Sequence, residues 1–248
     1  MVDISKICIL VPLYKLSLEE YEYASIKQLF NILGDKYDIY ILCSNYVYEH
    51  INVYKNLFPF NNICYCFDNS YFENTGTYSK LLLHLEFYKM LKNDGYDWLL
   101  IYQPDCWIFK DELEYWVEKG YDYIGAPQYI RAFSKDYDNL QNTYGYNGNG
   151  GFSLRNIDSF IRNINDFKYS PLFYDYVDNG NIAEDYIIGN YFHFDKNPTF
   201  IECSKFSWEG APDLLYIIND FQLPFGCHGY NKCYDIFYKK YNLINLNA

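Results

Sequence analysis

The first part of the chain alternates short apolar runs with helical patterns, and this alternation constrains the fold more than any other feature. Strands are predicted at Ile7–Pro12, Asp38–Leu42 and Ile63–Phe67, and helices between them at residues 17–34 and 46–57. Ser17 to Glu20 reads as a capping box that opens the first helix, which runs towards Gly34. This order is the opening of a doubly wound parallel sheet, the half that usually binds a nucleotide.

A second apolar segment, Trp98–Phe109, predicts the central strand of that sheet. Trp98–Tyr102 is a continuous apolar run, short enough for a strand that is buried on both faces. The run ends in Gln103-Pro104-Asp105. Open α/β sheets bind ligands at the carboxyl ends of their strands, so Asp105 is a candidate functional residue. The alternative is that Pro-Asp only forms a turn.

The remaining elements follow from helical spacing and glycine positions. Thr77 or Ser79 is expected to cap a helix that Gly95 ends. Residues 128–146 are polar and lack a period, which predicts a long loop. Further helices are predicted at Asp111–Lys119, Ile157–Phe167 and residues 183–191, with a strand or sheet edge at Tyr123–Pro127. We find no repeat or linker, and therefore expect one domain over residues 1–248.

Composition and charge exclude several classes of function. The formal net charge of -12 argues against a nucleic-acid partner and against a basic membrane-surface helix. No run approaches the length of a transmembrane segment, and no signal peptide opens the chain. The 8 cysteines are expected to be reduced thiols in the cytoplasm, since Cys64-x-Cys66 lacks a second pair at zinc spacing. The 31 tyrosines and 19 phenylalanines suit a carbohydrate-binding surface, or else reflect an AT-rich genome.

Three candidate sites lie far apart in the sequence: Asp105, the pair Glu184-Asp185, and His228. Each alone has a structural alternative, because an acidic pair at a helix start caps the helix and a histidine in a glycine-rich turn is often structural. Between them lies Asn147–Arg155, a glycine-rich segment that precedes a strand. Its spacing differs from a dinucleotide fingerprint.

Several motifs, taken together and in order, resemble a family of mostly uncharacterised domains assigned to the glycosyltransferases. The resemblance runs from about Tyr78 to His228, and its most specific parts are G-N-G-G-F-S-L-R and P-F-G-C-H. The other motifs are Y-Q-P-D-C-W-I-F, D-Y-I-G-A-P, A-E-D-Y and K-F-S-W-E. The fold that the resemblance implies is the GT-A type, a single α/β domain around a mixed, mostly parallel sheet flanked by helices.

The resemblance also implies roles for the candidate residues. GT-A enzymes usually carry Asp-x-Asp after a central strand, and its last acid binds a divalent metal that holds the donor diphosphate. Gln103-Pro104-Asp105 takes that place, without the first acid. Asp105 and His228 are thus the implied ligands of Mn²⁺ or Mg²⁺. Glu184 is the implied donor-sugar contact, and Asp185 is the implied base of an inverting transfer.

The implied donor site spans both halves of the chain, with residues 1–100 holding the nucleotide and residues 101–248 the metal, donor sugar and acceptor. Uridine is the expected nucleoside of the donor. The lysines Lys80 and Lys205 are candidates for a phosphate contact or for ordinary surface positions. The expected donor-binding residues are Val11, Pro12, Tyr14, Asp68, Lys80, Gln103, Asp105, Gly150 and Gly151.

The function expected from these features is transfer of a sugar from a nucleotide sugar, expected to be a UDP-sugar, to a hydroxyl acceptor on a glycan, lipid-linked or protein-linked molecule. The alternative is a catalytically silent domain of the same fold that only binds a nucleotide sugar or carbohydrate. A nucleotidyltransferase would need a glycine-rich, basic loop after the first strand. The chain has Pro12-Leu13-Tyr14-Lys15 there, which argues against that class.

Overall fold

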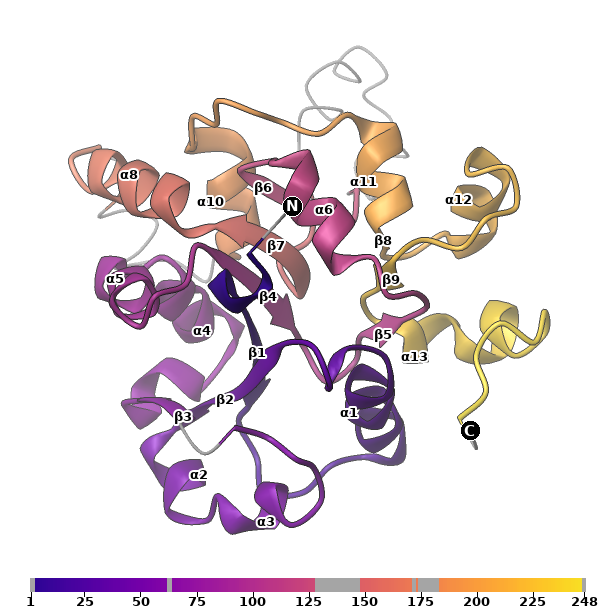
Figure 1. Ribbon diagram of the computed structural model, residues 1–248, viewed down its shortest axis with the longest axis horizontal. Coiled ribbons are helices and arrows are strands. Elements are labelled where there is room, and N and C mark those ends of the chain that lie inside the picture. Colours follow the sequence, from indigo (N-terminus) through magenta and orange to yellow (C-terminus); the bar gives the residue numbers. More distant parts are fainter. Residues whose placement is uncertain (1–2, 62–63, 128–147, 171–172, 174–182, 247–248) are drawn as a thin grey trace.

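The computed structural model describes residues 3–61, 64–127, 148–170, 173 and 183–246 (Figure 1). The loop expected at residues 128–146 lies outside the described residues, as do Asn147 and the first residue of the expected third strand, Ile63. The described part forms a mixed α/β fold with one large and one small sheet.

A six-stranded sheet in the order β3-β2-β1-β4-β7-β6 forms the centre of the fold. The first four strands in that order are parallel, whereas β7 runs antiparallel to both β4 and β6. This confirms the expected mixed, mostly parallel sheet. The strands are β1 (Ile7–Leu13), β2 (Asp38–Ser44), β3 (Cys64–Phe67), β4 (Trp98–Tyr102), β6 (Tyr123–Gly125) and β7 (Phe152–Asn156).

Helices cover both faces of this sheet, because alternate side chains of its strands point to opposite sides. In β1, Ile7, Ile9 and Val11 join one apolar core, and Cys8 and Leu10 join the other. The first core is closed by α1 (Glu20–Leu33), α2 (Asn45–Glu49), α3 (Asn52–Lys55), α6 (Leu113–Lys119) and α11 (Phe200–Phe206). The second is closed by α4 (Thr75–Leu82), α5 (Leu85–Asn93), α8 (Ile157–Phe167) and α10 (Glu184–Tyr191).

The C-terminal part of the chain returns to the end of β4 through a small sheet. Its strands β5 (Trp107–Ile108), β9 (Gly226–Cys227) and β8 (Ser207–Trp208) pair in that order. An aromatic cluster that includes Trp208 and Phe237 packs this sheet against the last helices. These last helices are α12 (Pro212–Ile218), α13 (Tyr230–Cys233) and the π-helical turn η5 (Tyr234–Tyr238). Two 3₁₀ turns, η1 (Ile4–Lys6) and η2 (Asn69–Phe72), lie in the N-terminal half of the chain.

Two helix expectations were wrong in detail. Helix α1 begins at Glu20, and its capping box is formed by Glu19 and Glu22, because Ser17 lies two residues before the N-cap position. The single helix expected to end at Gly95 is two helices, α4 and α5, separated at Leu83 and His84. Asn74 caps α4 in a capping box with Thr77, so the cap lies ahead of both predicted residues.

The other boundaries agree more closely with the sequence. Helix α8 covers Ile157–Phe167 as predicted, and α10 begins directly after Ala183. The stretch at residues 46–57 divides into the short helices α2 and α3. In the described ranges no helix combines the length and apolarity needed to cross a membrane. All 8 cysteines are free thiols.

Candidate functional site

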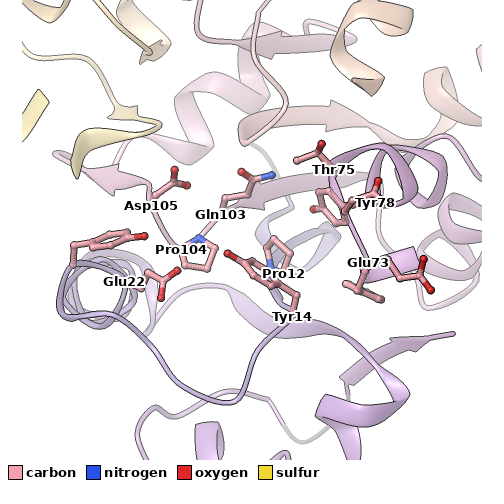
Figure 2. Close-up of a pocket in the computed structure, with 12 residues that line it drawn as sticks. Pro12, Tyr14, Glu22, Glu73, Thr75, Tyr78, Gln103, Pro104 and Asp105 are labelled. Atoms are coloured by element: carbon pink, nitrogen blue, oxygen red, sulfur yellow. The ribbon is translucent and has the colours of Figure 1, made fainter. Parts of the chain in front are cut away.

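A cavity of about 340 Å³ opens at the carboxyl ends of the adjacent strands β1 and β4 (Figure 2). Pro12 and Tyr14 enter it from the end of β1, and residues 103–105 from the end of β4. Helix α1 contributes Tyr21 and Glu22, and the segment from Phe72 to the first turn of α4 closes the opposite side. This is the edge of an α/β sheet where ligands bind, as the strand order predicts.

Asp105 and His228 lie in direct contact at this edge, although they are far apart in the sequence. The Nε2 atom of His228 is 3.2 Å from Oδ1 of Asp105 and 3.0 Å from Oε1 of Gln103. On the other side of the ring, Nδ1 lies 3.1 Å from Oε1 of Glu209. Backbone hydrogen bonds hold His228 beside Asp105. The His228 N–H donates to the Trp208 carbonyl in the small sheet, and the Tyr230 N–H donates to the Asp105 carbonyl.

The charges of this cluster shift the pKa values of both partners. Burial disfavours the protonated His228 ring, but hydrogen bonds to Asp105 and Glu209 outweigh burial and raise the His228 pKa to about 9. Burial acts to raise the pKa of Asp105, and the hydrogen bond from His228 overcomes it and holds that pKa below its usual range. In the absence of a metal, the pair is therefore an ion pair at neutral pH.

The donor atoms of the cluster fit a divalent cation. In an octahedral shell with bonds of about 2.1 Å, neighbouring ligand atoms lie about 3.0 Å apart. The separations of His228 Nε2 from the Asp105 and Gln103 oxygens match that spacing. A histidine that binds a metal through one ring nitrogen commonly hydrogen-bonds a carboxylate through the other, and Glu209 contacts Nδ1 of His228 in this way. Within the described ranges no three His, Cys, Asp or Glu side chains form a metal cluster, so the set depends on the Gln103 amide oxygen.

Two glycines connect this cluster to the acidic pair on α10. A Cβ on Gly151 would lie 2.5 Å from Nε2 of His228 and 2.8 Å from Oε1 of Gln103. A Cβ on Gly150 would lie 2.1 Å from Oε1 of Glu184. Glycine is therefore required at both positions by close approach. The Gly151 carbonyl accepts from the Gln103 N–H at 2.9 Å, which fixes the turn against the end of β4.

The adjacent acids Glu184 and Asp185 have different partners. Glu184 Oε1 lies 3.1 Å from Nη2 of Arg155, whose side chain is fully buried, and Glu184 Oε2 accepts from the Ser79 hydroxyl. Asp185 Oδ2 lies 3.4 Å from the backbone N–H of Gly150. Arg155 also donates to the carbonyl of Gly150 and to the Tyr88 hydroxyl. This network holds the glycine turn between β7 and α10.

Five of the nine expected donor-binding residues do not line the described cavity. Val11 is fully buried in the core, Asp68 caps η2 by accepting from Ser70, and Lys80 lies further along α4. Pro12, Tyr14, Gln103 and Asp105 do line it. Gly151 lies against His228, and Gly150 lies against Glu184, both outside the cavity lining. Their roles in donor binding remain predictions.

Sequence reasoning assigned no role to Glu209 or Arg155, although both lie in the motifs that carry the resemblance. A buried acidic partner of Arg155 could have been predicted, since an arginine in the buried strand β7 requires one. The role of Glu209 could not be predicted from the sequence, because its contact with His228 depends on how β8 and β9 pair.

Comparison with known proteins places the chain in a family. A family model described as "Protein of unknown function (DUF5672)" matches residues 63–228. The chain belongs to the DUF5672 family. This match contains the Tyr78–His228 span of the motifs and all of the candidate metal and acid residues. No curated protein sequence matches this DUF5672 chain significantly.

Solved structures show that the DUF5672 chain has the GT-A fold. The galactosyltransferase LgtC, in complex with donor and acceptor sugar analogs, matches with a TM-score of 0.53 at 14% identity, over 89% of this chain and 86% of its own. A glycosyltransferase involved in glycosylation of the major capsid of PBCV-1 matches with a TM-score of 0.52 at 8% identity, covering 96% and 99%. GlyE from Streptococcus pneumoniae TIGR4 matches with a TM-score of 0.50 at 15% identity, covering 98% and 62%.

Proposed function

We propose that this chain is a metal-assisted glycosyltransferase that moves a sugar from a nucleotide sugar to a hydroxyl acceptor. The observation that carries the proposal is the convergence of Gln103, Asp105 and His228 beside a cavity at the carboxyl ends of β1 and β4. The GT-A fold supports it as an analogy. The proposed acceptor is a glycan or a lipid-linked or protein-linked glycoconjugate.

The donor is proposed to span the two halves of the chain. Residues 1–100 would hold the nucleotide, with a uracil base and its ribose near Val11–Tyr14 and Asp68. Residues 101–248 would hold the diphosphate, sugar and acceptor, with Lys80 as a candidate phosphate contact. The aromatic wall of the cavity at Tyr14 and Tyr21 supports the base position, because planar bases stack on rings.

Asp105 and His228, with the Gln103 amide oxygen, would hold the divalent ion, Mn²⁺ or Mg²⁺. When bound, such an ion neutralises the charge that develops on the leaving diphosphate. Glu209 keeps the His228 ring oriented so that Nε2 faces the cluster. The imidazole in this set favours Mn²⁺ over Mg²⁺.

The chemical step is proposed to use Asp185 as the base. The acceptor oxygen attacks the anomeric carbon, the bond from that carbon to the diphosphate oxygen breaks, and Asp185 takes the acceptor proton. Glu184 is less suited to this role, because accepting the proton would disrupt its buried ion pair with Arg155. Glu184 would instead contact the donor sugar or support the glycine turn. Attack from the face opposite the diphosphate inverts the anomeric configuration.

A catalytically silent nucleotide-sugar-binding or carbohydrate-binding domain is the second candidate. Two observations favour it: Gln103 stands where an acid is usual, and the described residues hold no metal cluster made of His, Cys, Asp and Glu alone.

One experiment separates the two candidates. The purified chain is incubated with a panel of nucleotide sugars and Mn²⁺, and release of the nucleoside diphosphate is measured with and without glycan acceptors. A glycosyltransferase releases diphosphate from one donor, and Asp105→Asn abolishes the release. Binding of a nucleotide sugar without any release supports the silent domain.

A further inference from the structure

The hydroxyl of Tyr78 is a buried polar group that makes no hydrogen bond of standard geometry in the part of the chain that the structure describes, although the Gln103 side chain lies near it. Such groups are rare in folded proteins, because burial removes water that would otherwise hydrogen-bond to them. A native orphan of this kind requires an explanation. Tyr78 has one in its position, because its side chain lines the cavity at the ends of β1 and β4.

Helix α4 places Tyr78 between the cavity and the acid network. Figure 2 shows Tyr78 beside Gln103, on the side of the cavity away from Asp105. The next residue, Ser79, donates to Glu184 Oε2 at 3.1 Å and so ties this turn of α4 to α10. Tyr88, on the next helix α5, uses its hydroxyl fully, since it donates to the Leu82 carbonyl and accepts from Arg155.

The surroundings of Tyr78 select the kind of group that its hydroxyl can bind. A tyrosine phenol is neutral at neutral pH, so the Tyr78 hydroxyl can donate a hydrogen bond, and the Glu184 carboxylate lies near it. The same carboxylate repels a phosphate oxygen. A sugar hydroxyl both donates and accepts, and can therefore pair with the phenol and with the adjacent Gln103 amide at once.

We propose that the Tyr78 hydroxyl is a specificity-determining contact that hydrogen-bonds a hydroxyl of the transferred sugar. The inference rests on the proposed function, since it assumes a nucleotide-sugar donor in this cavity. It assigns Tyr78 to the sugar and not to the nucleotide, which distinguishes it from residues at the end of β1 such as Tyr14.

The test compares Tyr78→Phe with wild type for binding of a nucleoside diphosphate and of the matching nucleotide sugar, both in Mn²⁺. Tyr78→Phe should weaken nucleotide-sugar binding by about 5- to 10-fold, the effect of one neutral hydrogen bond, and leave nucleoside-diphosphate binding unchanged. Its Tm without ligand should stay equal or rise, because the substitution removes an unpaired buried hydroxyl.

Two further variants serve as controls. Tyr88→Phe should lower the Tm, because it removes a hydroxyl that is hydrogen-bonded within the protein. Tyr115→Phe, on the exposed face of α6, should change neither stability nor binding. The inference is overturned if Tyr78→Phe binds the nucleotide sugar as wild type does, weakens both ligands equally, or lowers the Tm as Tyr88→Phe does. If wild type binds no nucleotide sugar at all, the proposed function fails and the inference fails with it.

Discussion

Gln103 and His228 lie 125 positions apart in the sequence, yet Oε1 of the glutamine is 3.0 Å from Nε2 of the histidine. The first follows the central strand β4, and the second follows β9 in the small sheet. Pairing of β5 with β9 joins the two, because β5 begins at Trp107, two residues after Asp105. The site is therefore closed by the return of the C-terminal segment onto the end of β4.

The first prediction concerns pH and the ion pair of His228. Its folded pKa of about 9 lies above the ordinary value of 6.5, so protonated His228 stabilises the metal-free fold fully below pH 6.5. That stability is lost as the pH rises through 9. In a chelator, His228→Gln should be less stable than wild type by on the order of 2–3 kcal/mol at low pH and nearly equal above the folded pKa. Urea unfolding at several pH values measures this difference, and a difference that does not vary with pH would contradict it.

The second prediction uses the two glycines as a matched pair. Gly151→Ala pushes a methyl group onto His228 and Gln103, whereas Gly150→Ala pushes one onto Glu184. Gly151→Ala should therefore weaken Mn²⁺-dependent donor binding by more than about 10-fold, since a small misplacement of ligands is costly. Gly150→Ala should mainly lower the Tm. Titration calorimetry measures donor binding, and thermal melts measure stability. If the two variants lose donor binding and stability to the same extent, the prediction of separate roles for Gly150 and Gly151 is contradicted.

The third prediction concerns the buried pair Arg155–Glu184. Arg155→Met leaves the Glu184 carboxylate buried without its cation, and should cost about 3–5 kcal/mol of unfolding free energy. The control is Lys89→Met, which breaks the exposed pair with Glu86 and should cost less than about 1 kcal/mol. Denaturant unfolding measures both. Equal losses would mean that Arg155 does not hold a buried carboxylate.

The fourth prediction concerns the base. Asp185→Asn should fold and bind donor as wild type does, but cut sugar transfer by about 10²-fold or more. Glu184→Gln serves as the comparison, and should lose stability because its partner Arg155 is fully buried. Transfer near the wild-type rate in Asp185→Asn would reject this assignment. A product that keeps the donor's anomeric configuration would reject the inverting mechanism.

The parallel strands of the large sheet could be predicted, because Ile7–Leu13 and Trp98–Tyr102 are continuous apolar runs that local patterning identifies. The bounds of β7 and the pairing of the small sheet could not. Helix ends were less predictable. Asn74, Thr77 and Ser79 all have side chains that can cap a helix, and only the packed structure shows that Asn74 is the N-cap of α4.

The candidate site was predictable only in part. Strand-end logic singled out Asp105, and the motif order singled out His228. The contacts of His228 with Glu209 and of Glu184 with Arg155 could not be predicted, since they join β9 to β8 and α10 to β7. Those contacts depend on tertiary pairing that no local pattern encodes. For the same reason Tyr78 reads in the sequence as one more apolar position on a helix face.

The most direct test of the central claim is a thermal melt of wild type and Asp105→Asn with a panel of nucleotide sugars, in Mn²⁺ and in chelator. A ligand at 100 times its Kd stabilises the native state by about 2.7 kcal/mol, which is readily measured as a rise in Tm. The account predicts that one nucleotide sugar raises the Tm of wild type in Mn²⁺ only, and that Asp105→Asn loses this rise. No rise with any nucleotide sugar, or an equal rise in chelator and in Asp105→Asn, would contradict it.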